Sequence, residues 1–156
     1  TNLTEKMHSF YLKNMYLNNQ LVEKNQIVLD GVSIDIQSIQ TPSYFLATEL
    51  DHIAPWKSVY SGAMLFKGPI EFVLAGSGHI NGVINPPSKN KYGYHTQESM
   101  NESPEQWLQK AHHHSGSWWT HWQAWLSKHS GQSLKVHETN EHLPSLGTAP
   151  GHYVLR

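Results

Sequence analysis

Two apolar runs separated by a helical segment constrain the fold of this 156-residue chain more than any other feature. The first run is SYFLATEL at residues 43–50, and the second is IEFVLA at residues 70–75. Short aliphatic and aromatic runs of this kind are typical of buried strands. The segment between them has Pro55 near its start and ends at Gly68-Pro69, as expected for a helix. Consecutive buried strands joined by a helix predict a parallel sheet with a right-handed crossover.

The segments before and after this unit carry further signals of secondary structure. Apolar residues at roughly helical spacing predict an amphipathic helix over residues 5–22. The pair Asp30-Gly31 lies between two β-branched runs and predicts a β-hairpin. Residues 82–96 are rich in Pro, Asn and Lys, so we expect an irregular surface segment there.

Two more helices are predicted in the second half of the chain. Ser103 and Pro104 supply a capping residue and a first-turn proline, so a helix is expected to start there and to run through His114. A second helix fits residues 117–130. Its apolar face would consist of Trp118, Trp122, Trp125 and Leu126. Residues 132–156 are polar and show no period.

The composition excludes several classes of function. Lys and Arg total 11 against 12 Asp and Glu, and no basic stripe is present, so nucleic acid is not expected as a partner. No apolar run approaches the ~20 residues that span a bilayer, and the first residues do not resemble a signal peptide, so we expect a soluble protein without a transmembrane segment. The chain has no cysteine, which removes thiolate chemistry within it. Since it begins at Thr1, we also expect that further sequence precedes it.

An acid and a histidine follow the two predicted strands. Asp51 comes directly after the first run, and His79 lies shortly beyond the second, in VLAGSGHINGV at residues 73–83. Because the carboxyl ends of parallel strands meet at one edge of a sheet, both side chains are expected at that edge. A histidine can accept and return a proton near neutral pH, and a carboxylate within reach fixes its tautomer. The chain order of acid and histidine is that of an α/β-hydrolase triad.

The nucleophile of such a triad is missing from the sequence. Ser77 lies between glycines but lacks the strand–elbow–helix frame of a G-x-S-x-G motif, and there is no cysteine. If Asp51 and His79 belong to a triad, its first member precedes Thr1. Two plainer interpretations stay open, with His79 as an ordinary loop residue and Asp51 as a helix cap.

The other histidines and the tryptophans have structural interpretations. His52, next to Asp51, is expected at the rim of the site. The histidines at 112–114 do not suit a zinc site, because consecutive residues on a helix point in different directions and no matched partner is evident. The tryptophan face is expected to pack on the sheet, with stacking on a ligand's rings as the alternative.

Several longer strings resemble one enzyme family. They are LDHIAPW (50–56), FVLAGSGHINGVINPPSKNKYGYH (72–95), ESPEQWLQKAHHHSGSWWTHWQAWL (102–126) and APGHYV (149–154). Together with residues 10–21 and 28–48, they are similar to the carboxyl-terminal part of class I polyhydroxyalkanoate (poly-3-hydroxybutyrate) synthases. The string G-H-I-x-G-V-I-N-P-P-x-K-N-K is long enough to be highly specific for that family.

The resemblance implies an acyltransferase that joins (R)-3-hydroxyacyl groups, typically 3-hydroxybutyryl, from coenzyme A thioesters into a polyester and releases coenzyme A. By motif, the family's histidine base corresponds to His79, and the aspartate that activates the incoming 3-hydroxyl corresponds to Asp51, either as a base itself or by orienting His79. The family's cysteine, in a G-x-C-x-G elbow, has no counterpart here. No cofactor is implied, because coenzyme A is part of the substrate and a product. The implied partners are the growing polyester chain, the granule surface and a second copy in a homodimer, in the cytoplasm.

The expected architecture is the carboxyl-terminal half of an α/β-hydrolase fold. Residues 1–96 would form part of the catalytic domain, residues 97–131 a helical segment packed on it, and residues 132–156 an extended tail. Alone, such a fragment is expected to be inactive for lack of the nucleophile. Two other functions stay open: an esterase or depolymerase of the same fold, and a non-catalytic module that binds polyester granules through its Trp-rich helices.

Overall fold

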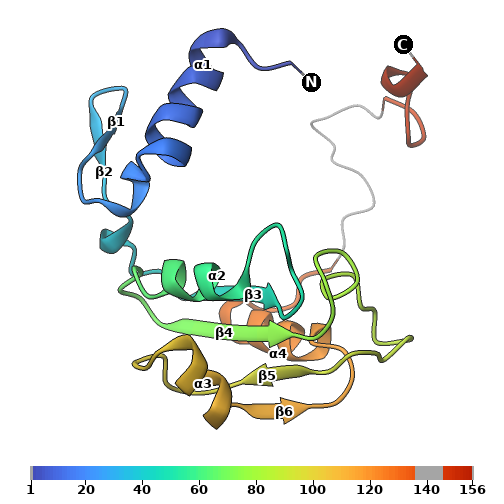
Figure 1. Cartoon of the computed structure of the whole chain (residues 1–156). Helices are drawn as coiled ribbons and strands as arrows, with labels where there is room; N and C mark the ends of the chain where they lie inside the picture. Colours follow the sequence, from blue (N-terminus) through green and yellow to red (C-terminus); the bar gives the residue numbers. More distant parts are fainter. Residues whose placement is uncertain (1, 136–145, 156) are drawn as a thin grey trace.

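The computed structural model describes residues 2–135 and 146–155, and they form a mixed α/β structure (Figure 1). The helices are α1 (Glu5–Phe10), α2 (Trp56–Ala63), α3 (Pro104–Lys110) and α4 (Trp119–His129), with a π-helix η1 (Tyr11–Leu17) and 3-10 turns η2 (Gln20–Val22), η3 (Ile36–Ser38) and η4 (Tyr153–Leu155). The strands are β1 (Ile27–Leu29), β2 (Val32–Ile34), β3 (Ser43–Thr48), β4 (Ile70–Ala75), β5 (Tyr94–Thr96) and β6 (His112–His114).

The central sheet has four strands in the order β3-β4-β5-β6. β3 and β4 pair in parallel, from Ser43 opposite Ile70 to Thr48 opposite Ala75, and α2 connects them. The predicted parallel pair with a helical connection is therefore confirmed. β5 and β6 extend the sheet as antiparallel strands, so the sheet as a whole is mixed.

Helices cover both faces of the sheet around β4. On one face, α2 and α3 contribute to a core that contains Tyr60, Ala63, Phe72, Leu74 and Trp107. On the other face, the start of α4 contributes to a core that contains Val73, Ala75, Tyr94 and Trp118. Since successive residues of a strand point to opposite faces, a strand covered on both sides must be apolar throughout. This explains the unbroken apolar run at residues 72–75.

A helix forms at the predicted amino-terminal position but ends at Leu17 and not at residue 22, and it does not pack on the sheet. Its path changes from α to π geometry at Tyr11. Three of the residues that suggested an apolar face are half or more exposed, namely Met7 (58%), Tyr11 (50%) and Leu17 (77%). Figure 1 shows α1 beside the β1–β2 hairpin and away from the sheet. The hairpin itself is confirmed, and Asp30 and Gly31 both have positive φ, as a type I′ turn requires.

Two predictions for the second half of the chain are wrong. The helix at Ser103 starts with the expected capping box, but it ends at Lys110 and not at His114. Residues 112–114 form β6, and the end of the segment expected to be irregular forms β5. Each of these strands has three residues, too few to show a period, and β5 hydrogen-bonds to both β4 and β6. Pairing with a preformed neighbour therefore decides their conformation more than local sequence does.

The helix predicted over residues 117–130 is confirmed as α4. Part of the predicted tail, residues 136–145 and 156, lies outside the described residues. Near the end of the chain, η4 interrupts the expected extended conformation with a single turn. The expected division of the chain at residues 96 and 131 stays a prediction.

The ring of Phe72 is central to the first core, so its removal tests the packing. Phe72 is 1% exposed and makes edge contacts with Tyr60 at 5.2 Å and Trp107 at 5.1 Å between ring centroids. We expect Phe72→Ala to lower the free energy of unfolding by ~3–5 kcal/mol, measured by urea denaturation. The control Val28→Ala, at a hairpin residue that is 53% exposed, should change it by less than ~0.5 kcal/mol. Equal effects would contradict this account of the core.

Candidate active site

The ladder between β3 and β4 continues beyond both strands and brings the following loops together. The backbone N–H of Glu49 donates to Ala75 O at 2.9 Å, and that of Leu50 donates to Ser77 O at 2.9 Å. Asp51 is the next residue on one side, and His79 follows closely on the other. The two loops therefore leave the sheet side by side at its carboxyl edge, as the sequence predicted.

The side chains of Asp51 and His79 are hydrogen-bonded to each other. His79 Nδ1 lies 2.8 Å from Asp51 Oδ2. The Asp51 side chain is 8% exposed, whereas that of His79 is 45% exposed. The second ring nitrogen of His79, Nε2, has no hydrogen-bond partner in the part of the chain that the structure describes. The arrangement is that of a carboxylate that orients an accessible imidazole.

Both oxygens of the Asp51 carboxylate accept hydrogen bonds. Its Oδ1 accepts hydrogen bonds from the backbone N–H groups of Ile53 at 2.8 Å and Ala54 at 2.9 Å, while Oδ2 faces His79. The Ala54 N–H and then His79 lower the pKa of Asp51 from 3.8 to about 2. Asp51 is therefore an anion at neutral pH and a weak base, suited to holding the imidazole in one tautomer. The interpretation of Asp51 as a helix cap is wrong, because the N-cap of α2 is Pro55 and Asp51 Oδ1 instead accepts from the loop residues Ile53 and Ala54.

The loop that carries His79 is tightly closed. Ser77 has a positive φ of 72°, and Gly82 N–H donates to Gly78 O at 2.8 Å. A Cβ on Gly82 would lie 2.5 Å from Thr48 Cγ2 and 2.6 Å from Gly76 O, so only glycine fits there. His79 thus projects from a compact turn packed on the end of β3.

Two indole N–H groups hold the far side of this turn. Trp118 Nε1 donates to Gly82 O at 3.0 Å, and Trp119 Nε1 donates to Val83 O at 2.9 Å. The expected packing of the tryptophan face on the sheet holds for Trp118, which is 7% exposed, but less for Trp122, which is 40% exposed. These indole contacts could not be predicted from the sequence, because periodicity indicates on which face of a helix a ring lies and not where its N–H points.

The Pro- and Asn-rich segment after the loop is ordered by a buried side chain. Asn85 is 2% exposed, and its amide both donates to Lys91 O and accepts from the Lys91 N–H. Ser117, just before α4, donates through Oγ to Asn85 O, and its N–H donates to Asn90 Oδ1. The long string that suggested the family therefore encodes one folded loop and its contact with α4.

Other described histidines near this region are His52, in the loop after β3, His95, in β5, and His121, in α4. His52 is exposed, and its side chain makes no hydrogen bond, ion pair or ring contact in the part of the chain described. His95 Nδ1 lies 3.1 Å from Glu49 Oε1, and His121 Nε2 lies 3.5 Å from Glu71 Oε1. Burial lowers the pKa of both His95 and His121. Within residues 2–135 and 146–155, no group of three or more His, Asp or Glu residues is placed to hold a metal ion.

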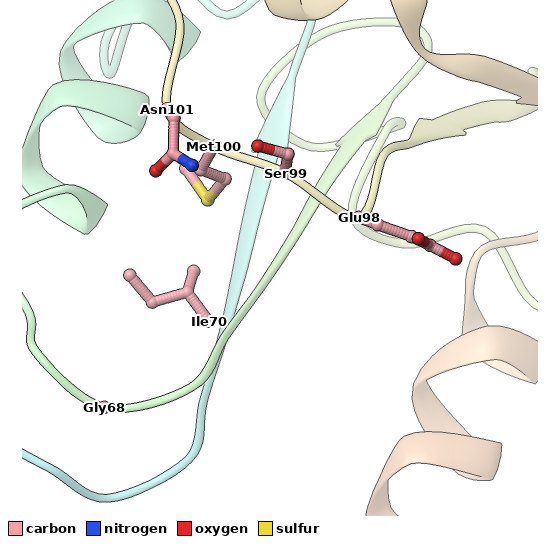
Figure 2. Close-up of a pocket in the computed structure, with 6 residues that line it drawn as sticks. All are labelled: Gly68, Ile70, Glu98, Ser99, Met100 and Asn101. Carbon is pink, nitrogen blue, oxygen red and sulfur yellow. The ribbon is translucent and has the colours of Figure 1, made fainter.

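An open hollow lies at the opposite end of the sheet from Asp51 and His79. Figure 2 shows it between the start of β4 and the segment that leads into α3. Its lining consists of Gly68, Ile70, Glu98, Ser99, Met100 and Asn101. Since β4 starts at this end and His79 follows its other end, the hollow is separate from the acid–histidine site.

Comparison with known proteins gives relatives along almost the whole chain. The poly(3-hydroxyalkanoate) polymerase subunit of Rhizobium etli is 44% identical over 156 residues, which are 99% of this chain and 24% of that protein. The corresponding subunit of Cupriavidus necator is 40% identical over 156 residues, or 99% of this chain and 26% of that protein. The polymerase of Methylorubrum extorquens is 45% identical over 157 residues, with the same two coverages. Almost the whole chain is therefore homologous to one part of the poly(3-hydroxyalkanoate) polymerases.

The match covers only part of each polymerase. The chain spans about a quarter of the length of the relatives named above. No family model matches it. None of the helices in the described ranges is long and apolar enough to cross a membrane. The family resemblance expected from the sequence is confirmed. The catalytic roles expected for Asp51 and His79 stay a prediction.

The titration of Asp51 tests the geometry of the pair. In the His79→Ala variant, we expect the pKa of Asp51 to rise above about 2 but to stay below 3.8, because the Ala54 and Ile53 donors remain. NMR titration of the carboxyl carbon measures this. Because folding lowers this pKa, the carboxylate contributes stability that is present above about pH 4 and is lost as the pH falls toward 2. His52→Ala is the matched control and should leave the Asp51 titration unchanged, and a shift there would contradict the assignment.

Proposed function

We propose that this chain supplies the histidine base and the orienting aspartate of a poly(3-hydroxyalkanoate) polymerase. The reaction would join (R)-3-hydroxyacyl groups, typically 3-hydroxybutyryl, from coenzyme A thioesters into a polyester. The observation that carries the proposal is the 2.8 Å contact between His79 Nδ1 and Asp51 Oδ2, in a chain homologous to these polymerases. The fold would be the carboxyl-terminal half of an α/β-hydrolase, which the parallel β3–β4 pair and its helical connection support.

The nucleophile would be a cysteine outside this chain. Its thiolate attacks the thioester carbonyl, the acyl group moves to the cysteine, and coenzyme A leaves as a thiol with the proton that His79 carries. A thiol nucleophile suits this exchange, because it matches the leaving group and keeps the acyl group activated. In the next half-reaction, the 3-hydroxyl of another acyl group gives its proton to His79 and attacks the acyl–cysteine. An ester forms, and the cysteine thiolate is regenerated.

Asp51 would act through His79 and not as a base in its own right. A general base works best when its pKa lies near the working pH, whereas the pKa of Asp51 is about 2. Both of its oxygens already accept hydrogen bonds, and its side chain is 8% exposed. The exposed imidazole is the better acceptor for a proton from either the cysteine or the hydroxyl.

The proposal extends to partners and location. The polymerase would need no cofactor, since coenzyme A enters with the substrate and leaves as product. We propose that the whole protein acts as a homodimer at the surface of polyester granules in the cytoplasm. The chain alone would not polymerise, because it has no cysteine.

The alternatives make different demands on the chain. An esterase or depolymerase would pair the same histidine with a serine from a G-x-S-x-G elbow and would release a free hydroxy acid. A non-catalytic granule-binding module would need Trp119 and Trp122 but not His79. The carboxylate accepts hydrogen bonds at both oxygens and faces an open imidazole, which favours catalysis over both packing and binding alone.

A chimera tests the proposal directly. In it, this chain replaces the matching quarter of the Rhizobium etli polymerase, to which it is 44% identical. We expect the chimera to release coenzyme A from 3-hydroxybutyryl-CoA and to form polymer. His79→Ala should slow acyl–enzyme formation by about 10²- to 10⁴-fold, as removal of a general base does. Asp51→Asn should slow both acyl–enzyme formation and elongation, because the imidazole that serves both half-reactions loses its orienting partner.

The control for this experiment is His52→Ala, which removes a neighbouring exposed histidine. It should retain the rate of the unmodified chimera. Normal coenzyme A release in both His79→Ala and Asp51→Asn would refute the site assignment. Release of free 3-hydroxybutyrate without polymer would redirect the proposal to a hydrolase.

A further inference from the structure

We propose that Trp118 and Trp119 are positioning residues that hold the His79 loop in register with Asp51 through their indole N–H groups. This inference rests on the proposed function, in which His79 is the base. The two indoles donate to the carbonyls of adjacent residues, Gly82 and Val83, at 3.0 and 2.9 Å. The loop is thus held at two places: Asp51 contacts it at His79, and the two tryptophans contact it at Gly82 and Val83.

The loop needs such an anchor because His79 is otherwise held at a single atom. Its side chain is 45% exposed, and its contact with Asp51 through Nδ1 is its one side-chain hydrogen bond among the described residues. Within the turn, Gly82 N–H bonds to Gly78 O and Ile84 N–H bonds to Ile80 O, both at 2.8 Å. These bonds close the turn on itself, and the two indole contacts, next to the Ser117–Asn85 hydrogen bond, tie its far end to the start of α4.

The tryptophans are themselves rigidly placed. Trp118 is 7% exposed and packs in the core that contains Val73, Ala75 and Tyr94. The backbone N–H of Trp119 donates to Ser117 Oγ at 3.1 Å, and the same Ser117 hydroxyl donates to Asn85 O, further along the loop. An indole bears one donor on a flat ring with few rotamers, so a fixed ring gives a fixed donor direction.

Packing alone does not explain the position of these N–H groups. The chain has six tryptophans, all within the described residues, and only Trp118 and Trp119 donate a side-chain hydrogen bond. Trp107 shows the alternative, since it is 0% exposed in the other core and its Nε1 has no partner. The two tryptophans whose N–H groups are satisfied are therefore the two that face the His79 loop.

The test removes the N–H while keeping an aromatic ring. The variants are Trp118→Phe, Trp119→Phe and, at Trp119, replacement by 3-benzothienylalanine, which keeps the shape of the bicyclic ring with sulfur in place of N–H. The controls are Trp122→Phe and Trp125→Phe in the same helix, whose indoles donate no hydrogen bond in the described structure. Circular dichroism and Tm establish that each variant folds.

The first readout is the NMR titration of Asp51 in the full chain. If the two indoles position His79, the pKa of Asp51 should rise from about 2 in Trp118→Phe, in Trp119→Phe and in the benzothienylalanine variant, because His79 moves away from the carboxylate. The pKa should stay unchanged in both controls. The second readout is the kinetics of the chimera. The same three variants should lower its kcat about 10- to 100-fold with little change in KM, as expected for a displaced base.

The benzothienylalanine variant decides the outcome, since it preserves packing. An unchanged Asp51 titration and unchanged kcat in this variant would overturn the inference. If the chimera instead keeps its activity with His79→Ala, the proposed function fails. The Asp51 titration would still show whether the two indoles position His79. The two proposals can therefore fail separately.

Discussion

The parallel pairing of β3 with β4 is the constraint on which the rest of the structure depends. The pairing places the carboxyl ends of both strands at the same height, with Thr48 opposite Ala75. The ladder then continues through the N–H groups of Glu49 and Leu50, so that the loops beyond it are aligned before any side chain meets. A one-residue slip would reverse the faces of the strand and separate the acid from the histidine.

The sequence predicted this central unit because its signals are local and redundant. Two apolar runs, a helix between them and polar residues after each run all indicate the same parallel unit, and the Asp51–His79 contact follows from its geometry. The histidines at 112–114 were predicted as helix because they continue a helical segment without a break. Their strand conformation depends on Tyr94–Thr96 lying beside them, which is a relation between distant residues that no local pattern carries.

The difference between local signals and contacts of distant residues also explains which features of the site could not be predicted from the sequence. The contact between Asp51 and His79 could be predicted from strand order. The hydrogen bonds from the backbone N–H groups of Ile53 and Ala54 to the carboxylate could not, because they depend on the path of the loop. The tryptophans were recognised as one apolar face, whereas the partners of their N–H groups lie 36 residues away in sequence. Long-range polar contacts are selected by the finished fold, and composition or period says little about them.

The hydrogen bonds of Asp51 have a consequence for how the site assembles. The donors to Oδ1 are two and three residues from Asp51 in sequence, whereas His79 is 28 residues away. Contacts between near neighbours close in ~10–100 ns, while contacts of large sequence separation wait for the strands between them to pair. The acid can adopt its final geometry as a property of one short segment. His79 can meet Asp51 only after β3 and β4 have paired, so we expect the contact between the two side chains to form later in folding than the hydrogen bonds of Asp51 within its own loop.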